Sequence, residues 1–291
     1  MSLLTAIRGL TVTVLAATVT VCASGCADVG APRLPDGIGV TVFQDRFDYA
    51  GRQLELEVVN GTKESITVSQ ADFTSTRFVS SVAWRGDERV PAGGARDFRV
   101  QLPAPVCGSI STHADTVTLD VALRNGVVAR ATVVPSDPRS TLATVNTQDC
   151  LIASVEARAT IAMAPALSWS PGAHVPAVLE LLVTPTSADG SVTIDSLGGT
   201  VLLSLVDGAG TVIDVLSVGT TFTSASPAGK IPLSIVPSRC DAHAVEEDKR
   251  GTFFPLEVHT SDDRRGSMYI PVSDTVRREL YEFYGDYCGL P

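Results

Sequence analysis

The fold of this chain is decided by the stretch that begins with Arg239-Cys240-Asp241-Ala242-His243-Ala244-Val245-Glu246-Glu247-Asp248-Lys249-Arg250-Gly251 and ends at Cys288. A weaker copy of the pattern runs from Cys107 to Cys150. In both stretches a polar segment with one histidine follows the first cysteine. Two alternating apolar runs, an acidic segment and the second cysteine come next. The same order at similar spacing indicates a duplicated domain.

Both copies have the features of β-sheet proteins. Apolar and polar residues alternate in short runs, which is the pattern of half-buried strands. Asn60-Gly61 and Asn125-Gly126 are strong hairpin signals between such runs. The expected fold is mainly β, with two tandem immunoglobulin-like β-sandwich domains at residues 38–150 and 151–291. No long amphipathic helix is expected in the first domain.

The second domain is expected to begin with a strand at Val155–Met163. Near its end, Asp274 is positioned to cap a short helix that would bury Val276, Leu280 and Phe283. The aromatic residues of that segment also suit a strand, so both interpretations stay open.

The cysteines provide a test of the duplication. Four cysteines allow three pairings, and the duplication favours Cys107 with Cys150 and Cys240 with Cys288. Each disulfide would stabilise its domain by roughly 3–4 kcal/mol in the chain-entropy model. This pairing requires an oxidising compartment. The alternative, reduced and buried thiols, is less favoured because the chain carries an export signal.

Residues 1–25 are expected to be a signal peptide. Its apolar run, Gly9 to Val21, is too short for a comfortable membrane span. The small residues before Cys26 resemble a bacterial lipobox, which predicts lipid attachment at Cys26 and a tether at residues 26–37. The expected location is the extracytoplasmic face of the cell membrane. An ordinary secretory signal is the alternative.

The charge distribution limits the classes of partner. The net charge is −10, which argues against nucleic acid. Residues 151–291 hold 17 acidic and 9 basic residues, so most of the negative charge lies in the second domain. Solubility is sufficient to explain it.

The candidate ligand or metal site is the loop after Cys240, with Asp241, His243 and Glu247. Carboxylates and one imidazole can bind a divalent cation of the calcium or magnesium kind. The spacing does not match an EF-hand, so a structural role beside the disulfide is favoured. No other cofactor is expected. The sequence lacks Gly-x-Ser-x-Gly, His-Glu-x-x-His and phosphate-loop motifs, so no catalytic residues are assigned.

The run from Arg239 to Pro255 resembles a Cys-Asp-Pro-His-Ala…Glu-Asp-Lys…Gly-Thr motif found in secreted proteins and lipoproteins of high-GC Gram-positive bacteria. Ala242 stands where the motif has proline, which implies a less rigid loop. The family is uncharacterised, so the resemblance implies export and supplies no activity.

These observations predict a membrane-anchored lipoprotein with a non-enzymatic binding role at the cell envelope. The expected partners are the membrane, through the lipid, and an envelope protein. The first alternative is a metal- or solute-binding lipoprotein that serves a transporter. A cell-wall-acting enzyme ranks third, because no catalytic constellation is present.

Overall fold

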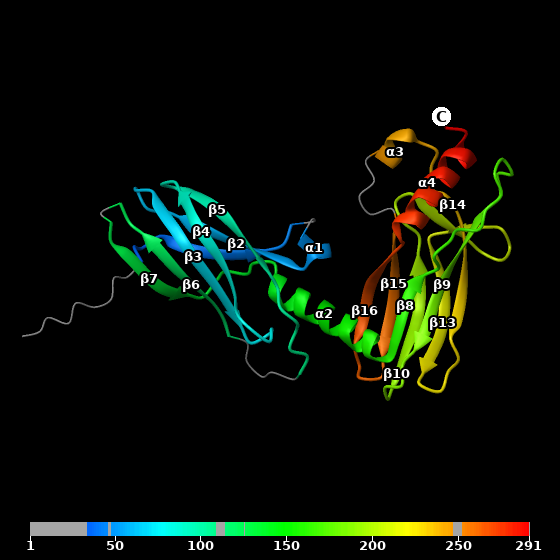
Figure 1. Cartoon of the computed structure of the whole chain (residues 1–291), viewed down its shortest axis with the longest axis horizontal. Coiled ribbons are helices and arrows are strands. Elements are labelled where there is room, and N and C mark those ends of the chain that lie inside the picture. The colour runs from blue at the N-terminus through cyan, green and yellow to red at the C-terminus, as the bar shows by residue number, and fades with distance from the viewer. Residues whose placement is uncertain (1–33, 46–47, 109–113, 125, 247–251, 291) are drawn as a thin grey trace, which may run out of the picture.

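The computed structural model describes residues 34–45, 48–108, 114–124, 126–246 and 252–290. Within them the chain forms two β-sandwiches joined by a single helix (Figure 1). The predicted signal peptide and Cys26 lie outside the described residues. Among the described helices, none is both long and apolar enough to cross a membrane.

The first sandwich consists of a three-stranded and a four-stranded antiparallel sheet, with a short helix, α1 (Asp48–Gly51), after the first strand. Inward-facing residues such as Val117, Leu119 and Val121 are fully buried between the sheets, as alternation predicts. The strand order in the described residues is β1 (Ile38–Phe43), β2 (Gln53–Asn60), β5 (Gly94–Gln101) in one sheet and β4 (Val82–Val90), β3 (Ile66–Ser75), β6 (Asp115–Ala122), β7 (Val128–Val133) in the other.

The second sandwich has a five-stranded and a four-stranded sheet, again antiparallel. Its order in the described residues is β12 (Val212–Ile213), β11 (Leu203–Val206), β14 (Gly229–Pro237), β9 (Ala177–Pro185), β8 (Ala159–Met163) in one sheet and β13 (Val215–Thr223), β10 (Ser191–Gly198), β15 (Phe253–Thr260), β16 (Arg265–Pro271) in the other.

The two sandwiches share one topology. The order β1-β2-β5 matches β8-β9-β14, and β4-β3-β6-β7 matches β13-β10-β15-β16. Even the irregularities correspond, because β3 has a bulge between Val68 and Gln70 and β10 has one between Ile194 and Ser196. The hairpin β11–β12 extends the second copy. The prediction of two tandem immunoglobulin-like sandwiches is confirmed.

Both predicted disulfides are present. Cys107 is bonded to Cys150, and Cys240 is bonded to Cys288. In each domain the first cysteine follows the same strand, β5 or β14, and the second lies in a helix after the last strand.

The helix α2 (Thr141–Arg158) corrects two predictions. No long helix was expected there, and residues 155–158 were expected to begin a strand. Leu142 and Val145 pack into the first core, whereas Leu151 and Val155 pack into the second. At 100° per residue the two pairs lie on roughly opposite sides of the helix, so no single apolar stripe marks it. The expected boundary between residues 150 and 151 lies within α2.

The helix at the C-terminal end, α4 (Asp274–Cys288), confirms the helical interpretation, with one correction. The cap is Ser273, whose Oγ accepts a hydrogen bond from the amide of Val276 at 3.2 Å. Asp274 lies in the first turn, where a carboxylate is favourable to the helix dipole. The buried residues Val276, Leu280, Phe283 and Tyr284 follow a helical period on one face.

Candidate functional site

The loop after Cys240 forms a short helix, α3 (Ala242–Glu246), held next to α4. The carboxylate of Asp241 accepts a hydrogen bond from the amide of His243 at 3.0 Å, and its carbonyl accepts one from the amide of Ala244, also at 3.0 Å. Asp241 therefore starts the turn of α3 with its own side chain. The side chain of His243 is exposed. Glu247 lies outside the described residues.

A buried tyrosine that sequence reasoning missed holds this loop. Tyr284 is 1% exposed, and its hydroxyl donates to the carbonyl of Arg239 and accepts from the amide of Asp241 at 3.3 Å. The phenol thereby satisfies backbone groups on both sides of Cys240. The described residues contain no group of three His, Cys, Asp or Glu side chains placed to hold a metal ion. Among the described residues, Asp241 shapes the start of α3 and Tyr284 fixes the backbone around Cys240.

Replacing Tyr284 with phenylalanine is expected to lower the free energy of unfolding of the second domain by about 1–3 kcal/mol, because buried backbone groups lose their partner. His243→Ala, on the exposed side of the same loop, is expected to stay within about 0.5 kcal/mol. Urea unfolding followed by the fluorescence of Trp169, whose ring centroid lies 5.8 Å from that of Phe283 in α4, measures both. Equal losses would show that the loop depends on His243 as much as on Tyr284.

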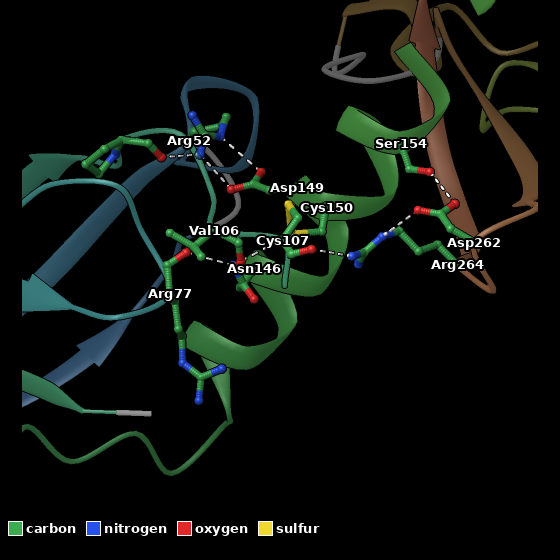
Figure 2. Close-up of a disulfide and its surroundings, with 11 residues drawn as sticks. Arg52, Arg77, Val106, Cys107, Asn146, Asp149, Cys150, Ser154, Asp262 and Arg264 are labelled. Atoms are coloured by element: carbon green, nitrogen blue, oxygen red, sulfur yellow. Dashed lines mark hydrogen bonds and ion pairs between the residues drawn. A yellow bond between two sulfur atoms is a disulfide. The ribbon is translucent and has the colours of Figure 1, made fainter. Parts of the chain in front are cut away.

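The junction between the domains contains a network of polar bonds around α2 (Figure 2). Asp149 on α2, only 8% exposed, accepts two hydrogen bonds from Arg52, Nε to Oδ1 at 3.0 Å and Nη2 to Oδ2 at 2.6 Å. Asn146 donates to the carbonyls of Arg77 at 2.9 Å and Val106 at 3.3 Å. Together with the disulfide at Cys150, these bonds fix the first half of α2 to the first sandwich.

The second half of α2 is fixed to the second sandwich. Ser154 donates to the carboxylate of Asp262 at 2.6 Å, and Arg158 lies 3.5 Å from the same carboxylate. Partial burial alone would raise the pKa of Asp262. The hydrogen bonds from Ser154 and Thr260 and the charge of Arg158 outweigh it, so the pKa falls to about 2. Asp262 is therefore ionised at neutral pH.

Two hydrogen bonds connect the sandwiches through this helix region. Arg264, in the turn after β15, donates to the carbonyl of Cys107 at 2.9 Å. Gln148 of α2 donates to the carbonyl of Ser267 on β16 at 2.7 Å. Arg264 thus joins the second sandwich to the Cys107 segment of the first. Gln148 joins the half of α2 that the first sandwich holds to a strand of the second.

A second buried charge cluster lies in the first sandwich. The carboxyl groups of Asp48 and Glu55 are almost fully buried, and one guanidinium, that of Arg99, lies 3.3 Å from Asp48 Oδ1 and 2.5 Å from Glu55 Oε1. Burial raises the pKa of Glu55, although the hydrogen bond and charge of Arg99 oppose the rise. The cluster balances two acids with one base.

On the outer face of the second sandwich, His259 Nδ1 lies 3.0 and 2.9 Å from the two carboxylate oxygens of Asp195. An imidazole oriented by a carboxylate is one part of many hydrolytic sites. Both side chains are more than a third exposed on a sheet surface. The sequence did not reveal the pair because Asp195 reaches β15 only through the bulge of β10.

A hollow with cationic walls lies at the opposite end of the first sandwich from α2. It has a volume of about 400 Å³, and its wall contains three cationic side chains, Lys63, Arg89 and Arg124, with one acid, Glu64. Sequence reasoning did not find it, because its cations come from three separate turns and strand ends.

Comparisons with known proteins do not identify a family. No protein-family model and no curated protein matches the chain. Among solved structures, it is similar to red sea bream transglutaminase (16% identity, TM-score 0.20), covering 83% of this chain and 30% of that one. It is also similar to the calcium-binding domain CBD12 of CALX1.1 (11% identity, TM-score 0.20, 79% and 80% covered). A third is the BSP domain of a biofilm-associated protein (9% identity, TM-score 0.24, 88% and 64% covered). Likenesses this weak have no bearing on activity.

Proposed function

We propose that this chain is an exported lipoprotein, anchored through Cys26 at the outer face of the cytoplasmic membrane, whose two sandwiches form a rigid binding module without enzymatic activity. The paired disulfides support the oxidising compartment that this requires. The lipobox-like residues before Cys26 support the anchor. The partner is an envelope protein.

The observation that carries the proposal is the continuity of α2 through both cores. Leu142 belongs to the first core and Leu151 to the second, and no linker separates them. A solute-binding lipoprotein that closes two lobes around its ligand needs a hinge between them. A helix shared by both cores offers no such hinge. It instead holds the second domain at a set distance and angle from the first, which suits presentation of a surface to a protein partner.

The anchor is tested by Cys26→Ser. This variant is expected to lose incorporation of radiolabelled palmitate and to shift from the membrane fraction to the soluble fraction, because it lacks the acylated residue. Cys22→Ser is the matched control, since Cys22 would be removed with the signal peptide, and it is expected to behave as the unmodified protein. Palmitate labelling that survives in Cys26→Ser would show that the lipid is not attached at Cys26 and would contradict the proposed anchor.

The binding role has its own measurement. Chemical crosslinking in intact membranes, followed by purification of the chain, is expected to recover an envelope protein with the anchored form and much less with Cys26→Ser. Thermal stabilisation by a sugar, a metal ion or a cell-wall fragment would instead favour a solute-binding role, because a ligand that binds only the folded state raises its stability.

A further inference from the structure

We propose that the end of the first sandwich farthest from α2 rests on an anionic lipid surface, with Lys63, Arg89 and Arg124 as the contacts to headgroup phosphates. This inference rests on the proposed lipid anchor. Beyond the anchor, it specifies which side of the molecule faces the membrane and which lipid headgroups this side contacts.

The described chain enters the first sandwich at one end of β2. The amide of Gly61, in the turn after β2, donates to the carbonyl of Gly37 at 2.8 Å. Ile38, the first residue of β1, is paired with Asn60, the last residue of β2. The described chain therefore enters at the turn end of β2. The other end of β2, at Gln53, lies beside Arg52, which binds α2.

Lys63, Arg89 and Arg124 lie at this same end of the first sandwich. Lys63 lies in the turn between β2 and β3, Arg89 next to the end of β4, and Arg124 in the turn after β6. Buried Asn60 holds the first two of these segments together, because its side-chain amide donates to the carbonyls of Glu64 at 2.8 Å and Val90 at 3.2 Å. Lys63 and Arg89 are therefore carried by segments that one buried amide fixes to each other.

The surface of this end carries more positive than negative charge. The side chain of Arg124 is 76% exposed and lies 3.8 Å from Glu64, while Arg89 donates to Ser65 at 3.1 Å. Glu88, the residue before Arg89, lies 3.6 Å from Arg96. The wall of the hollow thus keeps an excess of positive charge in a protein of net charge −10.

Apolar side chains accompany the cations. Val127 and Val128, immediately after the turn that holds Arg124, are 41% and 57% exposed. Cations beside exposed apolar groups are the composition of surfaces that lie at a membrane interface. The second domain has the opposite character, with 17 acidic and 9 basic residues, and an anionic surface would repel it.

The chain between Cys26 and the first sandwich is short. Eight residue steps separate Cys26 from Leu34, the first described residue, so the extended chain spans at most about 30 Å. An anchor this close keeps the cationic end at a high effective concentration near the lipid. A weak attraction is then enough to orient the molecule. Each lysine or arginine near an anionic bilayer strengthens binding about fivefold.

The test uses the mature chain without lipid, residues 27–291, which keeps every described residue. Flotation with vesicles of phosphatidylcholine and phosphatidylglycerol is compared with flotation on phosphatidylcholine alone. The triple variant Lys63→Gln, Arg89→Gln, Arg124→Gln is expected to lose at least about tenfold in partitioning to the anionic vesicles. Binding of the unmodified chain is expected to fall as salt rises.

The control triple variant, Arg265→Gln, Lys230→Gln, Arg278→Gln, makes the same change in net charge on exposed positions of the second domain. It is expected to bind within about twofold of the unmodified chain. Tryptophan fluorescence checks that both variants fold. Equal loss in the two triple variants, or no preference for anionic vesicles, would overturn the inference. Displacement by millimolar inorganic phosphate at constant ionic strength would also overturn it, by showing a small-anion site. Because no lipid is attached, failure here leaves the role of Cys26 untouched.

Discussion

Replacing Arg99 with methionine is expected to lower the free energy of unfolding at neutral pH clearly more than removal of a surface arginine does. The variant would leave the carboxylates of Asp48 and Glu55 buried without their shared cation. An uncompensated buried charge is far more costly than the loss of a surface ion pair. The side chain of Arg99 is itself 53% exposed, so solvent already screens part of the interaction and reduces the loss.

The matched control is Arg96→Met on the same strand. Arg96 lies 3.6 Å from Glu88, both side chains are about half exposed, and its loss is expected to stay under about 1 kcal/mol. Urea unfolding monitored by Trp84, whose ring centroid lies 4.5 Å from that of Phe98 on β5, reports on this sandwich. If Arg99→Met and Arg96→Met cost the same, the cluster is not a buried charge balance.

The pH dependence of the Arg99 variant has a definite sign. Burial already raises the pKa of Glu55, and loss of Arg99 raises it further. A raised folded-state pKa makes the folded state less favourable as pH rises through it and the carboxyl group ionises. The stability difference between Arg99→Met and the unmodified chain is therefore expected to shrink as pH falls from neutral toward the ordinary range of glutamate. A constant difference would contradict this cause.

Removal of the first disulfide, with Cys107→Ser and Cys150→Ala, is expected to lower stability by about 3–4 kcal/mol. The bond closes a segment with a sequence separation of 43 residues, so the unfolded chain gains much freedom when it is absent. Alanine is chosen at position 150 because that side chain is only 2% exposed. The measurement is urea unfolding of the double variant with each tryptophan followed separately, in Trp169→Phe and Trp84→Phe backgrounds.

The two tryptophans also test whether the domains are coupled. Because α2 supplies Leu142 to one core and Leu151 to the other, loosening its first half is expected to shift the transitions of both Trp84 and Trp169. The corresponding double variant of Cys240 and Cys288 is the comparison, since that disulfide lies away from α2. If removal of the first disulfide moved the Trp84 transition alone, the sandwiches would be independent folding units.

The features that the sequence predicted are those encoded locally or by repetition. Alternation revealed the strands, and the recurrence of the pattern around Cys107 and Cys240 revealed the disulfide pairing. The helix α2 escaped because its apolar residues serve two cores on opposite sides. Its first amides are also bonded by a residue that lies before the usual capping position. The carboxylate of Asp137 accepts hydrogen bonds from the amides of Thr141 at 2.7 Å and Leu142 at 2.9 Å, whereas the side chain of Ser140 makes no capping bond.

The candidate site was harder to predict than the fold. Asp241 and His243 attracted attention as polar neighbours in sequence, yet the carboxylate of Asp241 is used to form α3. The ion pairs whose carboxylates are buried are formed only by tertiary structure. Arg52 and Asp149 are separated by 97 residues, and Glu55 and Arg99 by 44. Pairings of that kind leave no local pattern to detect.

The link between β1 and the segment before α2 determines how tension would pass through the molecule. The amide of Val42 donates to the carbonyl of Ser136 at 2.9 Å, and the amide of Ser136 donates to the carbonyl of Val40 at 2.8 Å, in a parallel arrangement. Ser136 adjoins Asp137, which caps α2. In the anchored molecule proposed above, a pull between Cys26 and a partner bound to the second domain would load these bonds in shear, together with the β1–β2 ladder. The force would travel from the first strand almost directly into the shared helix, so an anchored molecule could be drawn taut while its first sandwich stays folded.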